Sequence, residues 1–393
     1  MNRLASNDDD KKVRDWFVEE TRLYGCFHKI DHMGNIFAIR PGQNNDLPPI
    51  AIGSHLDTQP TGGRYDGILG VLCGIEVLRI LHENQVTTYA PFAIVNWTNE
   101  EGARFPPAML ASGVWAEEFT TDYGQSRSDH SGITLGEELS RIGYLGPEPC
   151  SYKSIPLLAH FECHIEQGTL LEEANLPVGA VKGVQCIGWY NIHVTGKESH
   201  CGSAPMNRRH DALLAAANII VAVNKLAAEG EYFEKGSRAT IAVINSEPQS
   251  INTIAGKVQM SLDVRCVTDE DLKGLETLIS NSIDGVAERH GVDVEFKNIW
   301  TSPGIDFDNL MVQCVQDSAA SIDCHKTLVS SVGHDSVYTS KRVPTAMLFT
   351  RCRDGVSHNP AEYTTPEDCA ASAEVMLGAY LRYDDLVRDS HGA

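Results

Sequence analysis

Two short apolar runs in the first quarter of the chain predict buried strands. Residues 50–56 and 91–97 are almost continuously apolar, and each run ends in polar side chains. Runs of this kind are typical of strands covered on both faces in an α/β sheet. Between them, residues 69–81 carry apolar side chains at helical spacing, which predicts a helix that ends near Asn84. Because ligands of such sheets bind beyond the carboxyl ends of the strands, the polar residues after each run are candidates for chemistry.

The pattern changes after about residue 187. Residues 187–195 and 258–268 alternate between apolar and polar positions, which predicts half-buried strands, and residues 211–226 form an apolar helical stretch. The sequence Thr268-Asp269-Glu270-Asp271 predicts a helix start with a capping box. The helix after it carries its apolar side chains on one face: Leu272, Leu275, Ile279, Ile283 and Val286. This part of the chain is therefore expected to be a small α+β module.

Beyond about residue 300 the chain again shows the apolar pattern of its first part. Residues 345–350 again predict a buried strand, and a final helix is expected to start at Thr365-Pro366. The sequence therefore predicts an α/β domain built from residues 1–186 and 300–393. An α+β domain of residues 187–299 is inserted into it.

Composition and charge narrow the class of protein. With 42% hydrophobic and 22% charged residues, the 393-residue chain has the composition of a soluble protein of two domains. No apolar run approaches the roughly 18 residues that span a membrane, and the N-terminus lacks the apolar core of a signal peptide, so a cytoplasmic protein is expected. The net charge of −21 argues against nucleic acid as a partner. Eleven cysteines without a C-x-x-C pair indicate reduced thiols.

The polar residues after the first two runs are suited to metal chemistry. His55 and Asp57 form a His-x-Asp pair, in which the Asp57 carboxylate can accept the second ring N–H of a metal-binding His55. Asp66 lies in a glycine-rich turn that allows close approach to a ligand. Glu100 and Glu101 are adjacent carboxylates after a buried strand, which a nearby cation would stabilise. One of them can bind metal while the other faces water as a base.

Histidines further along the chain can complete such a site. His164 and His358 are candidates for two more nitrogen ligands. His160, four residues before His164, is expected to be structural. The pair His334-Asp335 is a candidate for supporting contacts around the ligands.

These segments, taken in order, resemble one family. It is the dinuclear zinc amidohydrolases that include N-carbamoyl-L-amino-acid hydrolases, β-ureidopropionases and allantoate amidohydrolases, which are related to aminoacylases and dipeptidases. The resemblance extends over nearly the whole chain, and its segments are 53–74, 96–105, 164–168, 196–206, 249–256, 263–265, 333–336 and 357–362. It implies a zinc-peptidase-like catalytic domain with an inserted lid domain that forms a homodimer.

The resemblance also implies a role for each metal ligand. Asp66 would bridge two divalent cations, one also held by His55 and His164, the other by Glu101 and His358. Zinc is expected, with manganese or cobalt as alternatives for this mixture of nitrogen and oxygen ligands. Glu100 would be the general base, and Asp57 would support the ligands.

The substrate-binding residues implied by the family lie mostly in the inserted domain. His200 would reach the active site of the partner subunit and stabilise the oxyanion, and Arg265 would hold the substrate carboxylate as a two-pronged ion pair. On its alternating strand Arg265 shares the polar face with Asp263. Asn252 and Gln167 would be further polar contacts to the substrate.

Two features depart from the family pattern. The chain begins where these proteins already have an N-terminal helix behind them, so a shortened N-terminus is expected. Asn252 is followed by Thr253-Ile254-Ala255-Gly256, whereas relatives have a proline before this glycine, which predicts a local change in a substrate loop.

The function implied by the resemblance is metal-dependent cleavage of a linear C–N bond. The expected substrate is small and anionic, an N-carbamoyl-L-amino acid or 3-ureidopropionate, cleaved to the amino acid, CO2 and ammonia. Allantoate amidohydrolase activity is the alternative that the same ligands would serve. Aminoacylase or dipeptidase activity fits less well, because segment 164–168 is of the carbamoylase type. A non-catalytic dimeric scaffold is the alternative outside the enzymes, but every ligand of the family is present.

Overall fold

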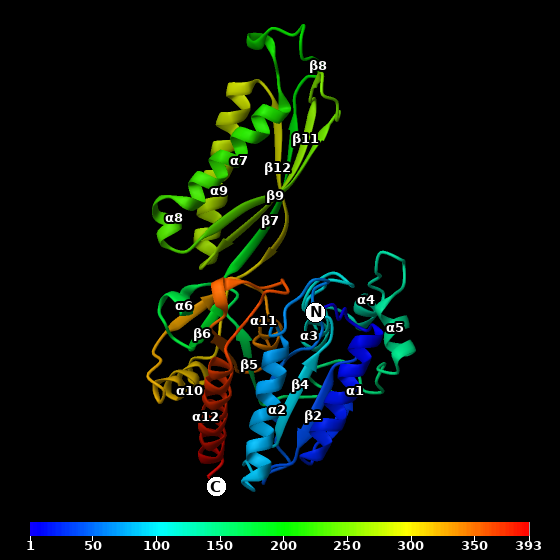
Figure 1. The fold of residues 1–393 in the computed structure, drawn as a ribbon, viewed down its shortest axis with the longest axis vertical. Helices are drawn as coiled ribbons and strands as arrows, with labels where there is room; N and C mark the ends of the chain where they lie inside the picture. The colour runs from blue at the N-terminus through cyan, green and yellow to red at the C-terminus, as the bar shows by residue number, and fades with distance from the viewer. Residues whose placement is uncertain (393) are drawn as a thin grey trace. The chain divides into compact units, whose positions relative to one another are not determined.

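A computed structural model describes residues 1–392 of the chain, which divides into two compact units (Figure 1). The first unit contains residues 1–183 and the segment from residue 306 onward, and the second contains residues 184–305. None of the helices in the described range 1–392 is long and apolar enough to cross a membrane.

The first unit is built around a mixed sheet with the strand order β1-β2-β4-β3-β5-β15-β6-β13, in which β13 is the short strand Ile305–Asp306, and β14 also pairs with β6. β3, β4, β5 and β15 run parallel, and every residue in them is buried, as expected for strands covered on both faces. This confirms the strands predicted at 50–56, 91–97 and 345–350. The other strands of this sheet are β1 (Phe27–Ile30), β2 (Ile36–Arg40), β3 (Ile50–His55), β4 (Phe92–Trp97), β5 (Ala159–Ile165), β6 (Val178–Val184), β14 (Thr327–Ser330) and β15 (Thr345–Thr350).

Helices α2 (Ile68–Glu83) and α12 (Pro366–Ser390) pack side by side on this sheet, and α10 (Asn309–Ala320) packs against α12 (Figure 1). Both predicted helices are confirmed: Asn84 is the C-cap that follows α2, and Thr365 caps α12 by accepting a hydrogen bond from the Asp368 N–H. Helix α1 (Asp8–Leu23) packs on β2. The remaining helices of the unit are α3 (Leu110–Trp115), α4 (Thr121–Gln125), α5 (Leu135–Ile142), α6 (Leu170–Glu173) and α11 (Ser336–Thr339), with a 3-10 turn at Arg353–Gly355.

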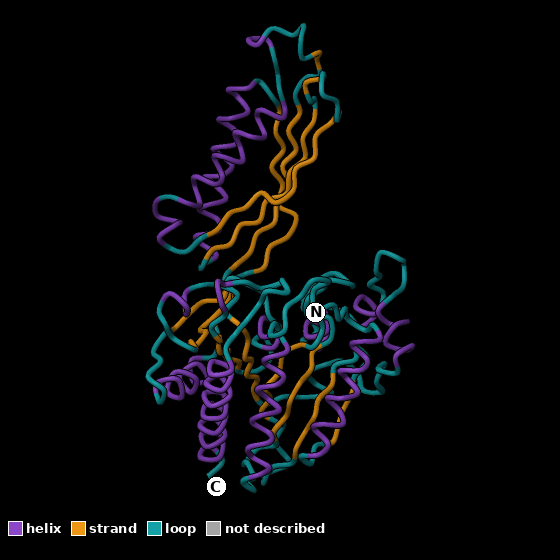
Figure 2. Tube along the Cα trace, in the orientation of Figure 1, coloured by secondary structure: helices purple, strands orange, loops and turns teal. Residues whose placement is uncertain are grey.

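The second unit is a four-stranded antiparallel sheet with two long helices on one face (Figure 2). Its strands, in spatial order, are β12 (Asp293–Ser302), β7 (Cys186–Thr195), β11 (Lys257–Cys266) and β9 (Arg238–Glu247). The helices are α7 (Ala212–Ala228) and α9 (Asp269–His290), and Thr268 caps α9 by accepting from the Asp271 N–H. Alternate residues of the strands form the core against the helices, as the sequence pattern predicts. The smaller elements are β8 (Ser199–His200), β10 (Thr253–Ile254), α8 (Gly230–Glu234) and a 3-10 turn at Met206–Arg208.

A glycine in α2 sets how closely this helix lies on β5. A Cβ atom at Gly70 would be 2.2 Å from the carbonyl oxygen of Cys163 and 2.7 Å from the Cβ of Ser54. Both partners belong to central strands, which cannot move independently of the sheet. The close approach matters because Cys163 immediately precedes a candidate ligand.

We therefore expect Gly70→Ala to lower the free energy of unfolding by about 1–3 kcal/mol, because the extra methyl group forces helix and strand apart. The matched control is Gly285→Ala in α9, where an added Cβ meets nothing within 4 Å. There the higher helix propensity of alanine should raise stability by up to about 1 kcal/mol. Chemical denaturation followed by circular dichroism measures both changes. A Gly70→Ala protein as stable as the unmodified one would contradict the close packing of α2 on β5.

Candidate active site

The candidate ligands come from the carboxyl ends of neighbouring parallel strands. His55 ends β3, His164 lies near the end of β5, and Glu101 follows β4. Asp66 lies in the loop between β3 and α2, and His358 lies between β15 and α12. Because β4, β3, β5 and β15 are adjacent in the sheet, residues up to 303 positions apart meet at one edge.

The carboxylate of Asp66 lies at the centre of this cluster. Its Oδ1 is 3.0 Å from Nε2 of His164 and 3.6 Å from Nε2 of His55. Its Oδ2 is 3.2 Å from Nε2 of His358, which is itself 3.4 Å from Oε2 of Glu101. The five residues thus form two groups of potential metal ligands, His55-Asp66-His164 and Asp66-Glu101-His358, which share Asp66.

The chemistry of these groups fits two divalent cations. Nε2 of His55 is buried without a hydrogen-bond partner. Burial and the nearby Asp66 carboxylate raise the pKa of Glu101 to about 7. Burial lowers the pKa of His55 to about 4, so its ring is neutral and its nitrogen can bind a metal. Positive charge placed between these buried carboxylates would favour their ionised forms.

Backbone carbonyl groups fix the orientation of two of the imidazoles. Nδ1 of His55 lies 3.0 Å from the carbonyl oxygen of Asp57, and Nδ1 of His164 lies 2.9 Å from that of Ile165. A carbonyl group only accepts hydrogen bonds, so each Nδ1 is the protonated donor. The Nε2 atoms then face Asp66, and in the neutral form of each ring Nε2 is unprotonated, which is the arrangement that metal-binding histidines need.

The structure corrects the contact predicted for the Asp57 side chain. The His55 ring bonds to the main-chain carbonyl of Asp57, and the nearer carboxylate oxygen is 3.9 Å from Nδ1. The carboxylate instead accepts the backbone N–H groups of Glu100, at 3.2 Å, and Glu101, at 3.3 Å. Burial and the charge of Glu101 raise the pKa of Asp57 to about 8. Asp57 therefore holds the turn that presents the two glutamates.

Glu100 lies beside the ligand groups and belongs to neither. Its Oε2 is 3.5 Å from Nε2 of His55, whereas Glu101 accepts hydrogen bonds from the backbone and side-chain nitrogens of Gln59. The preceding residue, Asn99, has a left-handed φ of 59°, so the chain turns sharply between β4 and the glutamates. Burial, followed by the charge of Asp335, raises the pKa of Glu100 well above its usual range.

Sequence reasoning did not single out two residues that hold the Asp66 loop. Oε1 of Glu362 accepts the N–H groups of Tyr65, at 2.8 Å, and Asp66, at 3.0 Å. The hydroxyl of Ser357 donates to Oδ2 of Asp66 at 2.9 Å. The feature of the sequence that points to this contact is the glycine at position 63. A Cβ atom at Gly63 would overlap the Glu362 carboxyl group.

Gly67 is needed on the other side of the same loop. It has a positive φ of 68°, and an added Cβ would lie 2.2 Å from the His55 ring. The glycines around Asp66 therefore make room for Glu362 and for His55.

The other histidines of this region lie around the cluster. His160 is fully buried, between the indole N–H of Trp97 and the hydroxyl of Thr339. The ring of His334 packs edge-on against that of His164, with centroids 4.5 Å apart. Asp335 accepts a hydrogen bond from Ser112.

Of the predicted substrate-binding residues, Gln167 lies at the cluster. Its amide Nε2 donates to Oδ2 of Asp66 at 3.0 Å and to Ser357 at 2.8 Å, while its buried Oε1 has no hydrogen-bond partner.

The other three predicted substrate-binding residues belong to the second unit, which brings two of them together. His200 pairs with Thr253 between β8 and β10, and the carbonyl of Asn252 accepts the N–H of Cys201. Arg265 lies apart from them on β11. It forms a two-pronged ion pair with Asp263, with Nε 2.9 Å from Oδ1 and Nη2 3.1 Å from Oδ2.

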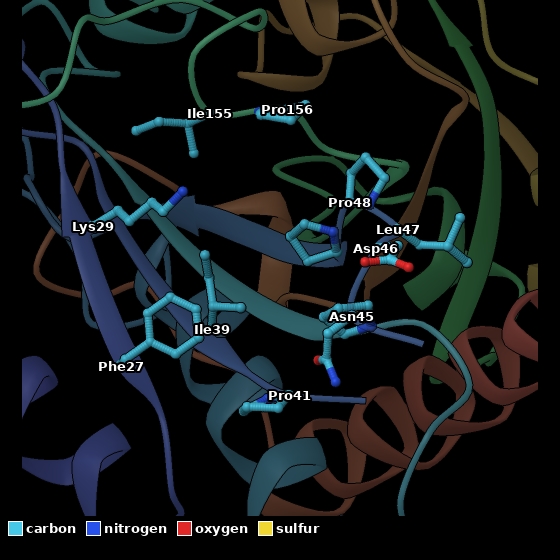
Figure 3. Close-up of a pocket in the computed structure, with 12 residues that line it drawn as sticks. Phe27, Lys29, Ile39, Pro41, Asn45, Asp46, Leu47, Pro48, Ile155 and Pro156 are labelled. Carbon is cyan, nitrogen blue, oxygen red and sulfur yellow. The ribbon is translucent and has the colours of Figure 1, made fainter. Parts of the chain in front are cut away.

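A cavity of about 470 Å³ in the first unit contains none of these residues (Figure 3). Its lining comes from β1, from the end of β2, and from the segments that precede β3, β4 and β5, including Pro48, Pro49, Pro91 and Pro156. It therefore lies toward the amino ends of β3, β4 and β5, whereas the candidate ligands gather at the carboxyl ends. We exclude it as the active site on that ground.

Comparison with known proteins agrees with this geometry. The family model of peptidase family M20/M25/M40 matches residues 51–382. An N-carbamoyl-L-amino-acid amidohydrolase of Rhizobium meliloti is 39% identical, over 98% of this chain and 92% of that protein. A ureidoglycolate hydrolase of Arabidopsis thaliana is 30% identical, over 96% of this chain and 80% of that protein.

A solved structure extends the likeness to the whole fold. The crystal structure of an amidase of the hydantoinase/carbamoylase family from Burkholderia multivorans superposes with a TM-score of 0.91 at 42% identity, over 97% of this chain and 92% of that one. The chain belongs to peptidase family M20/M25/M40, in its hydantoinase/carbamoylase group.

Proposed function

We propose that this protein is a metal-dependent amidohydrolase that cleaves an N-carbamoyl-L-amino acid or 3-ureidopropionate to the amino acid, CO2 and ammonia. The observation that carries the proposal is the pair of ligand groups that share Asp66, with Glu100 beside them. The 39% identity to an N-carbamoyl-L-amino-acid amidohydrolase supports the same class of substrate.

The residues that would hold the cations are His55, Asp66 and His164 on one side, and Asp66, Glu101 and His358 on the other. The mixture of imidazole and carboxylate ligands suits zinc and also accepts manganese or cobalt. Divalent cations held there supply Lewis-acid polarisation of a carbonyl group and a nucleophile from water near neutral pH.

Glu100 is the general base in this proposal. It takes a proton from the water that attacks the ureido carbonyl carbon, and delivers it to the nitrogen that leaves when the C–N bond breaks. Asp57 orients this base through the backbone N–H of Glu100. Since Glu100 is buried, it shuttles the proton away from bulk solvent.

Four polar residues recognise the substrate in this proposal. Arg265 holds the carboxylate, and Asn252 and Gln167 hydrogen-bond to the substrate. His200 stabilises the oxyanion, for which its ring is suitably oriented. Its Nδ1 accepts the N–H groups of Gly202 and Ser203, so in the neutral ring the proton is on Nε2, which can donate to an oxyanion.

A second candidate is hydrolysis of ureidoglycolate or allantoate, which the same ligands and base would catalyse. The observation in its favour is the 30% identity to a plant ureidoglycolate hydrolase. Both candidates share the cleaved bond and differ in the group attached to the ureido nitrogen.

We also propose that the protein is a homodimer formed by the second unit, in which His200 acts in the active site of the partner. β9 is the edge strand of its sheet, and Val243 and Ile244 on it are 50% and 45% exposed. α7, which packs beside β9, exposes Leu214 and Val221. An edge strand with unpaired backbone groups and an apolar neighbouring helix is suited to pairing with a second copy.

Ammonia release by metal-loaded protein tests the proposed function. N-carbamoyl-L-amino acids, 3-ureidopropionate, allantoate and ureidoglycolate are assayed side by side, and turnover of the first two is expected. Glu100→Gln should keep its metal content, because Glu100 is outside both ligand groups, and lose about 100- to 10,000-fold in kcat. Metal analysis of the same samples separates loss of the base from loss of the cations. A Glu100→Gln protein with normal turnover would disprove the role of the base.

Arg265→Ala tests recognition of the carboxylate. Loss of a two-pronged charged hydrogen bond should raise KM for carboxylate substrates on the order of 100-fold. Neutral analogues, such as the corresponding N-carbamoyl amino amides, should be affected little. An equal effect on both classes would mean that Arg265 has a structural role only.

Mixing two inactive variants tests whether His200 acts across the dimer. His200→Ala and Glu100→Gln subunits, combined in equal amounts and allowed to exchange, form mixed dimers with one complete active site. Since half of the dimers are mixed and half of their sites work, about a quarter of the normal activity is expected. Samples that contain mixed dimers but stay inactive would place His200 in its own subunit's site or outside the mechanism.

A further inference from the structure

We propose that Trp189 and Trp300 form a platform for the side chain of the substrate, so that N-carbamoyl amino acids with aromatic or large apolar side chains are preferred. This inference rests on the proposed function, and specifically on Arg265 holding the substrate carboxylate. It selects a substrate class from among the ureido compounds that the metal ligands alone do not distinguish.

The two indoles pack against each other as a tilted pair on the helix-free face of the second unit's sheet. Trp189 on β7 lies directly opposite Trp300 on β12 and Asp263 on β11, so the three side chains share one face. The ring centroids are 4.6 Å apart and the planes are inclined by 43°. The next residue along β7, Tyr190, points to the other face and is buried in the core beneath the helices.

A bulge in β12 brings Trp300 to this position. The register of β12 against β7 shifts between Asn298, opposite Tyr190, and Trp300, opposite Trp189. In a regular strand Ile299 would be opposite Trp189, and Trp300 would be opposite Gly188 and would point toward the core face. Bulges that re-aim a side chain are typical of functional positions.

The indole pair is unusually exposed for such large apolar side chains. Trp189 is 44% exposed and Trp300 is 37% exposed, although the helix-covered face of the same sheet is packed with buried side chains. Paired indoles that remain open to solvent present an apolar surface at which an aromatic ligand group gains from ring contacts and from loss of water.

A hydrogen-bond chain joins this platform to Arg265. The indole N–H of Trp189 donates to Oδ2 of Asp263 at 2.7 Å, and the same carboxylate holds the Arg265 guanidinium. The carboxylate and the side chain of an α-amino acid are attached to the same carbon atom. A substrate whose carboxylate is bound by Arg265 therefore has its side chain within reach of the neighbouring indoles.

The opposite flank of Arg265 has a different character. In the register of β9 against β11, Arg238 lies directly opposite Arg265. A substrate that turned its side chain this way would need an acidic group. The exposed indoles favour the apolar flank, and the two directions make opposite predictions about N-carbamoyl-L-aspartate.

Steady-state kinetics with N-carbamoyl-L-phenylalanine, N-carbamoylglycine and N-carbamoyl-L-aspartate test the platform. We expect kcat/KM for the phenylalanine compound to exceed that for the glycine compound by at least about tenfold. In Trp300→Ala this ratio should fall about tenfold, and Trp300→Phe, which keeps an aromatic ring, should retain most of it. Arg238→Ala, on the other flank, is the matched control and should leave the ratio unchanged.

Equal kcat/KM for the phenylalanine and glycine compounds would overturn the inference, as would a preference for the aspartate compound that Arg238→Ala abolishes. Both outcomes leave the proposed function intact, because N-carbamoylglycine is still hydrolysed. If metal-loaded protein hydrolyses neither these three compounds nor 3-ureidopropionate, the proposed function fails and the inference fails with it.

Discussion

The carboxylate of Asp66 is the point on which the candidate site depends, because both of its oxygens face imidazole nitrogens. Oδ1 lies 3.0 Å from His164, and Oδ2 lies 3.2 Å from His358. These residues come from three distant parts of the chain, and burial makes an isolated charge at this point costly. Opposite charges close to Asp66 outweigh that cost, and the pKa of Asp66 lies well below its usual range despite burial. A single carboxylate thus links two groups of potential ligands.

Two acids near the ligand groups hold backbone rather than ligands. Asp57 accepts the N–H groups of Glu100 and Glu101, and Glu362 accepts those of Tyr65 and Asp66. Each of these acids fixes a loop at the carboxyl end of a strand. A small shift of either loop would change the distances among the ligands, because Asp66 and Glu101 both lie in these loops. Positioning in this site therefore depends on side chains that touch neither water nor substrate in the proposed reaction.

The second unit combines a well-packed face with an unusual open one. Alternation along β7 and β11 buries one side of the sheet beneath α7 and α9. On the other side Asp263 connects Arg265 with the indole of Trp189, and the bulge at Ile299 adds Trp300. The residue proposed to bind the substrate carboxylate is therefore close to the residues proposed to contact its apolar side chain. The same strands that form the core also display the residues proposed to select the substrate.

The sequence by itself determined the elements with strong periodicity and the residue types of the site. The buried strands at 50–56 and 91–97, the helix start at Thr365 and the identity of the candidate ligands all follow from local pattern or from motif, because each depends on residues close together in the chain. Tertiary structure decided what depends on backbone geometry between distant segments. In the folded chain the Asp57 carboxylate accepts a hydrogen bond from the backbone of Glu100 instead of from His55, and the Glu362 carboxylate accepts one from the backbone of Asp66. The tertiary structure also turned Trp300 to the open face, because a one-residue bulge reverses the direction of a side chain without leaving a mark in the alternating pattern.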